Sequence, residues 1–324
     1  MGRSKGTLYI IVPCYNEELA LPHSAPLLRD QLVMMKEDRV LPSSRILFVN
    51  DGSSDATWEV ITRLHEQEPE VFSGLNLSRN QGHQNALLAG LMSVKEQADL
   101  TISIDADLQD DVHVMAEMVD LFNQGIDVVY GVRSKREKDS FFKRFTAQSF
   151  YKTMRALGAD TVMDHADYRL LSKRALEGLA EFREVNLFLR GLVPLVGFSH
   201  AMVPYERAER VAGDSKYPLR KMVSFAVEGI TSLSIKPIRI ISSIGVVFLS
   251  LSIVASVYVL VQFILGHVVA GWSSTLLSLW VIGGVVLISL GVVGEYIGKI
   301  YLETKARPRY LVESFLDSSS GDES

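Results

Sequence analysis

Two aspartates separated by one residue stand where an apolar run of the sequence stops. Asp105 and Asp107 follow the run 100–104, so both carboxylates can project toward one point. Carboxylates this close repel each other unless a cation lies between them. Carboxylate and phosphate oxygens suit Mg²⁺ or Mn²⁺, and Gln109 is placed to supply or orient one more oxygen. The pair predicts a divalent-metal site, with solvated turn or helix-cap aspartates as the alternative.

Polar residues also follow two earlier apolar runs, in 13–17 and 50–55. In a parallel α/β sheet, ligands bind outside the carboxyl ends of the strands, so we expect these residues to share one cleft with the aspartate pair. Neither G-x-G-x-x-G nor G-x-x-x-x-G-K-[ST] occurs in the chain. The sequence therefore supports neither a dinucleotide-binding Rossmann site nor a P-loop.

The elements that must position these residues alternate between strand and helix. The predicted strands are 7–12, 45–49, 74–77, 100–104 and 128–132, and the predicted helices are one ending near residue 36, then 56–67, 83–96 and 112–123. Strands that are apolar throughout and joined by helices predict a mostly parallel sheet covered by helices on both faces. The single cysteine, Cys14, excludes a disulfide framework and is predicted to be a packing residue.

The net charge limits the class of binding partner, and the N-terminal residues limit the cellular compartment. A net charge of -5 gives no basic footprint for nucleic acid, so nucleic-acid binding is not expected. The apolar run 8–12 is too short for the core of a secretory signal peptide. We therefore expect the N-terminal domain to stay in the cytosol.

The C-terminal third changes character. From Ile240 to Gly294 there is no Asp, Glu, Lys or Arg. The runs 240–265 and 275–293 are each long enough to cross about 30 Å of hydrocarbon as a helix. Lys and Arg flank both outer ends, which predicts a two-helix membrane hairpin with the N-terminal domain and both termini cytoplasmic. The alternative is a buried hairpin in a soluble core. A transporter would need more spans.

Before the first span, apolar residues recur at helical spacing in 219–233 with basic residues between them. This pattern predicts an interfacial amphipathic helix, or else a helix packed on the catalytic domain. Gly294 and Gly298 have the small-xxx-small spacing of helix contacts and suggest a homo-oligomer, for which a tetramer is one form. The predicted organisation is a catalytic domain at 1–212, a juxtamembrane segment at 213–238, two membrane helices within 239–300 (about 240–265 and 275–297), and a cytosolic tail at 301–324, polar and disordered after Val312.

Seven short motifs occur in order along the chain. They are Val12–Glu17, Asn50–Ser53, Ser78–Gly82, Asp105–Gln109, Ala166–Leu170, Gly213–Tyr217 and Gly294–Gly298. With these segments the chain resembles the family 2 glycosyltransferases with a GT-A (Rossmann-like) fold, and among them the bactoprenol glucosyltransferases and dolichyl-phosphate mannose synthase. Asn50 departs from the Asp usual in the family. The Q-x-x-R-W signature of processive synthases is absent, which favours transfer of one sugar per acceptor.

The resemblance implies a role for each matching residue. Asp107 and Asp167 would be catalytic. The remaining implied sites are a nucleotide-sugar site at Pro13, Tyr15, Glu17, Val49, Asp51, Asp105, Ala106 and Arg133; an acceptor-phosphate site at Arg169, Arg210, Ser215 and Lys216; and a metal site at Asp105, Asp107 and Gln109. Arg169 could instead simply pair with Asp167, and Lys216 could be a membrane anchor.

The implied reaction is inverting transfer of one sugar, glucose from a UDP donor, to undecaprenyl phosphate at the cytoplasmic membrane face. Because phosphate monoesters have a second pKa near 6, such an acceptor is largely dianionic at pH 7. Asp167 can therefore be either a general base or a positioning residue. The alternatives are another sugar such as N-acetylglucosamine, a diacylglycerol acceptor, or a catalytically inactive membrane scaffold.

Overall fold

The computed structural model describes residues 3–107, 109–133, 165–185, 187–206, 234, 236–265 and 271–318. These residues belong to two units. The first holds the described parts of 1–145, 161–216 and 307–324, and the second holds those of 217–306. The predicted amphipathic segment 219–233 lies outside the described residues.

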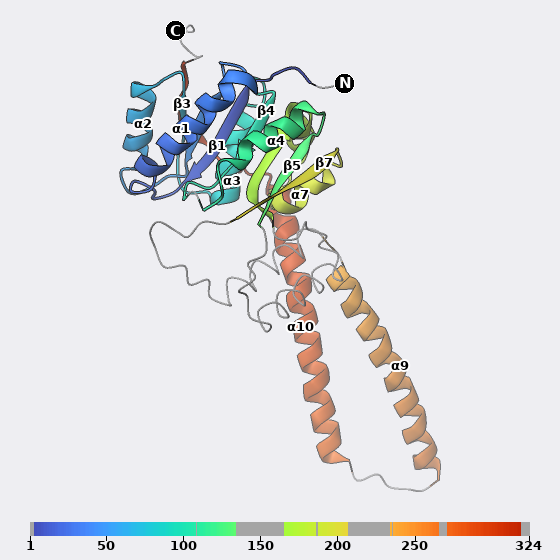
Figure 1. The fold of residues 1–324 in the computed structure, drawn as a ribbon. Coiled ribbons are helices and arrows are strands. Elements are labelled where there is room, and N and C mark those ends of the chain that lie inside the picture. Colours follow the sequence, from blue (N-terminus) through green and yellow to red (C-terminus); the bar gives the residue numbers. More distant parts are fainter. Residues whose placement is uncertain are drawn as a thin grey trace. The chain divides into compact units, whose positions relative to one another are not determined.

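The first unit is built on one eight-stranded sheet (Figure 1). Its order across the sheet is β7-β5-β6-β4-β1-β2-β3-β8. The strands are β1 Leu8–Cys14, β2 Arg45–Asn50, β3 Phe72–Leu77, β4 Leu100–Ser103, β5 Val128–Arg133, β6 His165–Ser172, β7 His200–Tyr205 and β8 Val312–Leu316. The five strands predicted from apolar runs are all present, with ends within two residues of those expected.

The sheet is mixed. The expectation of a mostly parallel sheet holds for β1 to β5 and β7, which share one direction, and β6 and β8 run against them. β1 pairs in parallel with β2 and β4, and β2 with β3, as the strand and helix alternation predicted. β6, however, runs antiparallel between β4 and β5, and β8 runs antiparallel along β3. Since β6 turns back between parallel neighbours, its residues reach the same end of the sheet from the opposite direction. This reversal brings the start of β6 next to the end of β4.

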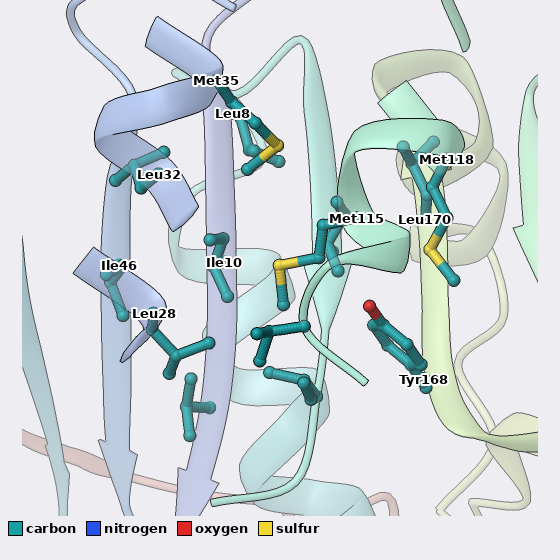
Figure 2. Packing of buried hydrophobic residues seen from close by; sticks show 14 of the residues in the cluster. Leu8, Ile10, Leu28, Leu32, Met35, Ile46, Met115, Met118, Tyr168 and Leu170 are labelled. Carbon is teal, nitrogen blue, oxygen red and sulfur yellow. The ribbon is translucent and has the colours of Figure 1, made fainter. Parts of the chain in front are cut away.

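Helices cover both faces of the sheet, as predicted. Successive side chains of a strand point to opposite faces, and on β1 Ile10 packs on the face covered by α1, α2 and α4, while Ile11 packs on that covered by α3, α6 and α7. Figure 2 shows side chains of the first face, Leu8, Ile10, Leu28, Leu32, Met35, Ile46, Met115, Met118, Tyr168 and Leu170. The helices are α1 Leu21–Asp38, α2 Thr57–Gln67, α3 His83–Ser93, α4 Val114–Asn123, α6 Lys173–Ala180 and α7 Leu189–Leu195.

The C-terminal strand β8 was not predicted. The sequence led us to expect disorder after Val312, and that expectation is wrong for 312–316, which pair with β3. Arg45 of β2 reaches the end of this strand and donates to the carboxylate of Asp317 at 3.2 Å, where the Asp317 side chain is 1% exposed. The Ser73 hydroxyl donates to the same carboxylate oxygen at 3.4 Å. β8 has a mixed composition. It pairs along the open edge of β3, and the buried guanidinium of Arg45 binds Asp317 at its end.

The second unit contains two long helices, α9 Lys236–Ile264 and α10 Trp272–Lys305. Within the described residues, Val281–Lys305 is the one stretch long and apolar enough to cross a membrane by length and composition. Apolar side chains such as Leu287 and Ile288 are about 70% exposed along it. α10 runs beyond the predicted end near residue 297, passing Glu295 before it stops at Lys305.

Candidate functional site

The ends of β1 and β2 are tied together by short polar contacts. Asn16 adopts a left-handed conformation with φ of 56°, and its side-chain oxygen accepts the backbone N–H of Ser54 at 2.9 Å. The Ser53 hydroxyl accepts the backbone N–H of Asn16 in return at 3.0 Å. Tyr15 stands next to this turn with half of its surface exposed. The two strand ends therefore form one rigid edge with an aromatic ring at its rim.

Asp51 holds the loop that leads into α3. Its two carboxylate oxygens accept the backbone N–H groups of Gln81 and Gly82 at 2.7 and 2.9 Å. Burial raises the pKa of Asp51, while these two hydrogen bonds act in the opposite direction. Gly52 follows with φ of 60°, and a Cβ there would lie 2.4 Å from the carbonyl carbon of Arg79. Only glycine allows this approach, so the motifs 50–53 and 78–82 meet as backbone.

Asn50 stands where the resemblance leads one to expect Asp. Its side chain has a structural role. Its amide nitrogen donates to Asn76 at 2.7 Å, and its oxygen accepts the Ser53 hydroxyl at 2.6 Å. An aspartate would lack the donor for Asn76. The departure from the family pattern therefore comes with a partner on the next strand, and it leaves Asp51 unchanged.

Asp105 and Asp107 lie directly after β4. The backbone N–H of Gln109 donates to Asp107 at 3.3 Å, which braces the turn. Asp105 has a side chain that is 38% exposed and lies 3.6 Å from Nε2 of His83. Burial raises the pKa of Asp105, and the neighbouring carboxylates Asp167, Asp110 and Asp107 raise it further against the opposing effect of His83. Negative charge is thus concentrated at this strand end.

Arg133, at the end of β5, is held from two sides. Its Nη2 donates to the carboxylate of Asp110 at 3.3 Å, and its Nε donates to the hydroxyl oxygen of Tyr205 at 3.2 Å. Tyr205 in turn donates to Asp110 at 2.5 Å. Burial raises the pKa of Tyr205, and the charge of Asp110 adds to that effect. The guanidinium is therefore fixed beside the turn that carries Asp105 and Asp107.

Three cationic or ionisable side chains meet at Asp167, near the start of β6. Arg169 donates to one oxygen of its carboxylate. Arg190 donates through Nη2 at 3.0 Å and through Nε at 3.3 Å, and Nε2 of His83 lies 3.3 Å away. Burial of this carboxyl would raise its pKa, but the hydrogen bond with His83 and the two guanidinium groups outweigh burial and hold the pKa of Asp167 well below its usual range.

α3 and α7 are positioned to deliver these side chains. His83 is the first residue of α3 and Arg190 the second of α7. The Gln84 side chain accepts the backbone N–H of Leu189 at 2.8 Å, which joins the two helix starts. Arg169 also donates to the Leu189 carbonyl at 3.3 Å. The loop before α3 is itself held by Asp51, so one connected network runs from β2 to α7.

Several predicted residues lie at this edge with their side chains inside the core. Val49 is fully buried, and Ala106 and Gln109 are about 5% exposed, so Val49 and Ala106 would offer a ligand only their backbone atoms. Pro13 is buried in the same way, and Glu17 is half-buried, its backbone N–H donating to Thr57 at 2.8 Å. Arg210, Ser215 and Lys216 lie outside the described residues.

Sequence reasoning missed four side chains of the site: His83, Arg190, Asp110 and Tyr205. His83 and Asp110 directly follow motifs that were recognised, so a search one residue beyond each motif would have found them. Arg190 offers a weaker signal, as a lone arginine in the apolar run 187–193. Tyr205 has none, since only the parallel pairing of β7 with β5 brings it to Arg133.

The donor set suits a divalent cation that binds together with a substrate. Among the residues that the structure describes, no group of three His, Cys, Asp or Glu side chains could hold a metal ion alone. Mg²⁺ and similar ions usually bind through one or two carboxylates and complete their shell with substrate phosphates and water. Asp105 and Asp107 supply such a pair, and the crowding of carboxylates that raises the pKa of Asp105 is a repulsion that a cation would relieve.

Comparison with known proteins gives consistent matches along the chain. Residues 9–179 match the family Glycosyl transferase family 2. An uncharacterized glycosyltransferase of Bacillus subtilis (strain 168), YkoT, is 47% identical over 314 residues, which cover 97% of this chain and 93% of YkoT. The bactoprenol glucosyl transferase of Shigella phage SfX is 40% identical over 307 residues, covering 94% and 98%. The solved mannosyltransferase PcManGT from Pyrobaculum calidifontis, in complex with GDP-Man and Mn²⁺, is 17% identical, with a TM-score of 0.46 over 92% of this chain and 85% of that one.

Proposed function

The chain belongs to glycosyl transferase family 2, and from that membership we propose that it transfers a single glucose from UDP-glucose to a polyprenyl phosphate such as undecaprenyl phosphate. The reaction inverts the anomeric centre. It takes place at the cytoplasmic face of a bacterial inner membrane and makes a lipid-linked sugar for the cell envelope. The name of the phage relative supports both the sugar and the class of acceptor.

The observation that carries this proposal is that one histidine, His83, contacts a carboxylate at each of two strand ends. Nε2 of His83 lies 3.6 Å from Asp105 and 3.3 Å from Asp167. The first carboxylate belongs to the motif expected to bind the donor diphosphate, and the second to the motif expected to face the acceptor. The proposed donor and acceptor sites would thus be separated by one side chain, as a direct displacement between two substrates requires.

A membrane location supports a lipid acceptor. Val281–Lys305 can cross a membrane by length and composition, and we propose that α9 and α10 form a two-span hairpin with both outer ends cytoplasmic. The lysines and arginines outside 240–294 support this orientation. A polyprenyl tail held in the bilayer can present its phosphate only at the interface. Oligomerisation through Gly294 and Gly298 stays a prediction.

The proposed displacement balances without a separate acid or base. An oxygen of the acceptor phosphate forms a bond to the anomeric carbon, the bond from that carbon to the donor's diphosphate oxygen breaks, and the electron pair leaves with the nucleoside diphosphate. No proton needs to move, because the attacking oxygen carries none. A divalent cation held by Asp105 and Asp107, with Gln109 beside them, would neutralise charge that develops on the leaving group.

Other residues of the chain contribute binding and orientation. Arg133, fixed by Asp110 and Tyr205, supplies a positive charge beside the Asp105 turn for the donor diphosphate. Tyr15, at the exposed rim, is placed to stack on the base, and Asp51 fixes the loop beneath it. Pro13, Glu17, Val49 and Ala106 complete the proposed nucleotide-sugar site, and Arg210, Ser215 and Lys216 are proposed to hold phosphate next to the membrane.

The test uses the purified full chain in detergent with undecaprenyl phosphate, Mg²⁺ or Mn²⁺, and a panel of nucleotide sugars. Released nucleoside diphosphate and lipid-linked sugar are measured together. We expect both products with UDP-glucose, dependence on lipid phosphate and metal, and a loss of at least about 100-fold in Asp107→Asn, a change that keeps side-chain shape and removes charge. Asp38→Asn, at an exposed position with its side chain 64% exposed, is the matched control.

The panel separates the alternatives. Activity with UDP-N-acetylglucosamine in place of UDP-glucose would keep the reaction and change the sugar. Activity with diacylglycerol and none with undecaprenyl phosphate would replace the acceptor. Failure with every donor and acceptor, in protein whose unfolding is cooperative, would contradict the proposal and favour a membrane scaffold.

A further inference from the structure

The carboxylate of Asp167 has no room for another hydrogen bond. A carboxylate offers about four acceptor positions, and four donor atoms surround this one. They are Nη2 of Arg169, Nη2 and Nε of Arg190, and Nε2 of His83. The Asp167 side chain is only 8% exposed. Asp167 is therefore a counter-ion that holds other side chains in place, and it is poorly suited to accept a proton from a substrate.

Formal charge at this cluster is balanced only with the help of Asp105. The two guanidinium groups of Arg169 and Arg190 carry two positive charges, and Asp167 carries one negative charge; the second negative charge that acts on Arg190 is that of Asp105, which is proposed to bind the metal. Arg169 is 2% exposed, and its Nε is buried without a partner among the described residues. Burial of an uncompensated charge is costly unless an opposite charge can approach it. A divalent cation bound at Asp105 would take up that second negative charge, so the guanidinium groups would then need another anion as counter-ion.

Only two members of the cluster can meet such an anion. The side chain of Arg190 is 35% exposed and that of His83 is 41% exposed, whereas Arg169 is enclosed by the core. Arg190 uses Nε and Nη2 on Asp167, which fixes the plane of its guanidinium. A planar guanidinium in a fixed orientation is the side chain best suited to bind phosphate oxygens in pairs.

We propose that Arg190 and His83 bind the phosphate monoester of the lipid acceptor, and that Asp167 is the positioning residue that orients both. This inference rests on the proposed function, because it assigns a subsite for the acceptor of that reaction. His83 also contacts Asp105 at 3.6 Å, so a phosphate held there lies next to the strand end that is proposed to hold the donor diphosphate.

The geometry favours the acceptor phosphate over the donor diphosphate. Arg133 already stands beside the turn of Asp105 and Asp107, fixed by Asp110 and Tyr205. Arg190 is fixed by Asp167 on β6, and His83 contacts both this carboxylate and Asp105. Two arginines, each with its own buried carboxylate, thus occupy two places along the site, one for each phosphate-bearing substrate.

The test measures binding of farnesyl phosphate, a short polyprenyl phosphate, and of farnesol, the same chain without phosphate, to the full protein in detergent by calorimetry. In Arg190→Gln we expect the Kd for farnesyl phosphate to rise by about tenfold or more while that for farnesol stays within about twofold. Arg190→Lys keeps the charge and loses the planar fork, so its Kd should fall between the two. Arg29→Gln removes a surface arginine of α1 and is the control.

Kinetics with undecaprenyl phosphate supply the second readout. The KM for the lipid should rise by about tenfold in Arg190→Gln and by about threefold in His83→Gln, and the KM for UDP-glucose should stay within about twofold in both. An unchanged lipid KM and Kd, or an equal loss for farnesol, would overturn the inference. A rise confined to the KM for UDP-glucose would also overturn it by assigning Arg190 to the donor.

Failure of the inference is distinct from failure of the proposed function. If the wild-type chain binds farnesyl phosphate through Arg190 and transfers no sugar from any donor, the subsite stands and the proposed reaction falls. If the wild-type chain transfers glucose and Arg190→Gln keeps its affinity for both lipid phosphates, the reaction stands and the subsite is wrong.

Discussion

Tyr205 affects the site through a hydroxyl group that contacts no proposed substrate. That hydroxyl donates to Asp110 at 2.5 Å and accepts from Nε of Arg133 at 3.2 Å. Tyr205→Phe should therefore loosen Arg133 and raise the KM for UDP-glucose by about three- to tenfold, with kcat changed less. Steady-state kinetics with varied donor measure both.

Tyr168 provides the matched control for that experiment. Its ring packs edge-on against Tyr205 with centroids 5.4 Å apart, and its hydroxyl donates to the Asp111 carbonyl at 2.9 Å. Tyr168→Phe removes a neighbouring tyrosine hydroxyl, which is bonded to a neutral carbonyl, without touching Arg133. Equal donor KM values in the two variants would show that Tyr205 has only a structural part.

Asp127 gives a residue-scale prediction about pH. Burial would raise its pKa, but hydrogen bonds from Arg3, Ser172 and Ser199 outweigh burial and lower the pKa. A carboxyl whose pKa is lower in the folded chain than in the unfolded one stabilises the fold at neutral pH. That stabilisation is lost as the pH falls below about 4. Asp127→Asn should therefore lower the unfolding temperature at pH 7 and lower it much less at pH 3.

Thermal unfolding of the purified full chain at both pH values checks this prediction. Asp120→Asn removes a carboxylate whose side chain is 46% exposed and which pairs with Arg39 at 3.1 Å, so it should change either midpoint little. A loss of equal size at pH 7 and pH 3 in Asp127→Asn would contradict the electrostatic account.

The position of a site residue could be predicted where the residue belongs to a local sequence motif. Asp105 and Asp107 follow a strand that can be read from its apolar run, so their place at the sheet edge followed from the sequence. Arg190 and Tyr205 could not be found in that way, because their partners Asp167 and Arg133 are 23 and 72 residues distant along the chain. The pairing of β7 with β5 brings Tyr205 to Arg133, and the packing of α7 at the start of β6 brings Arg190 to Asp167.

At the scale of secondary-structure elements, we predict that β8 depends on the buried ion pair between Asp317 and Arg45. Asp317 is 1% exposed and accepts from Arg45 at 3.2 Å, whereas Glu70 pairs with the same arginine at 3.3 Å while 79% exposed. Asp317→Asn should lower the free energy of unfolding by about 2–3 kcal/mol, because it leaves the buried arginine poorly compensated. Glu70→Gln should cost less than about 1 kcal/mol.

Urea unfolding of the purified full chain measures both variants against the wild type. The two substitutions remove the same charge from the same arginine, so the difference between them reports burial. Equal losses would show that β8 is held by its backbone pairing with β3 alone.

The presence of five strands could be predicted from the sequence, whereas the antiparallel direction of β6 and β8 could not. β1 to β4 follow the alternation of strand and helix that produces parallel pairing. β6 comes after 134–164, a stretch that carries no apolar run like the earlier ones, so the alternation of strand and helix gives no direction for β6. β8 lies in a segment whose composition resembles a tail, and its pairing with β3 depends on contacts with residues more than 230 positions away.

For the whole molecule, the proposed topology can be tested with cysteine labelling. The native Cys14 is 1% exposed and burial raises its pKa well above the usual value, so it should give little background with a maleimide. Thr275→Cys places a thiol near the predicted external loop, and Asp38→Cys places one on α1. In intact cells a membrane-impermeant maleimide should label the first variant only.

Permeabilised cells are the control, since both thiols should then react. Labelling of Asp38→Cys in intact cells, or protection of Thr275→Cys there with reaction after permeabilisation, would contradict a hairpin whose ends are both cytoplasmic.

β8 comes late in the chain, so its pairing with β3 can form only late in synthesis. The edge of β3 is synthesised by Leu77, but its partner strand leaves the ribosome only after Val312, at the far end of both long helices. At roughly 5–20 residues per second, the edge waits on the order of 10–50 s without its neighbour. An unpaired strand edge is a template for aggregation. The sheet can therefore close only after α9 and α10 have been synthesised, and a ribosome that stalls between β3 and β8 leaves a chain with an open edge.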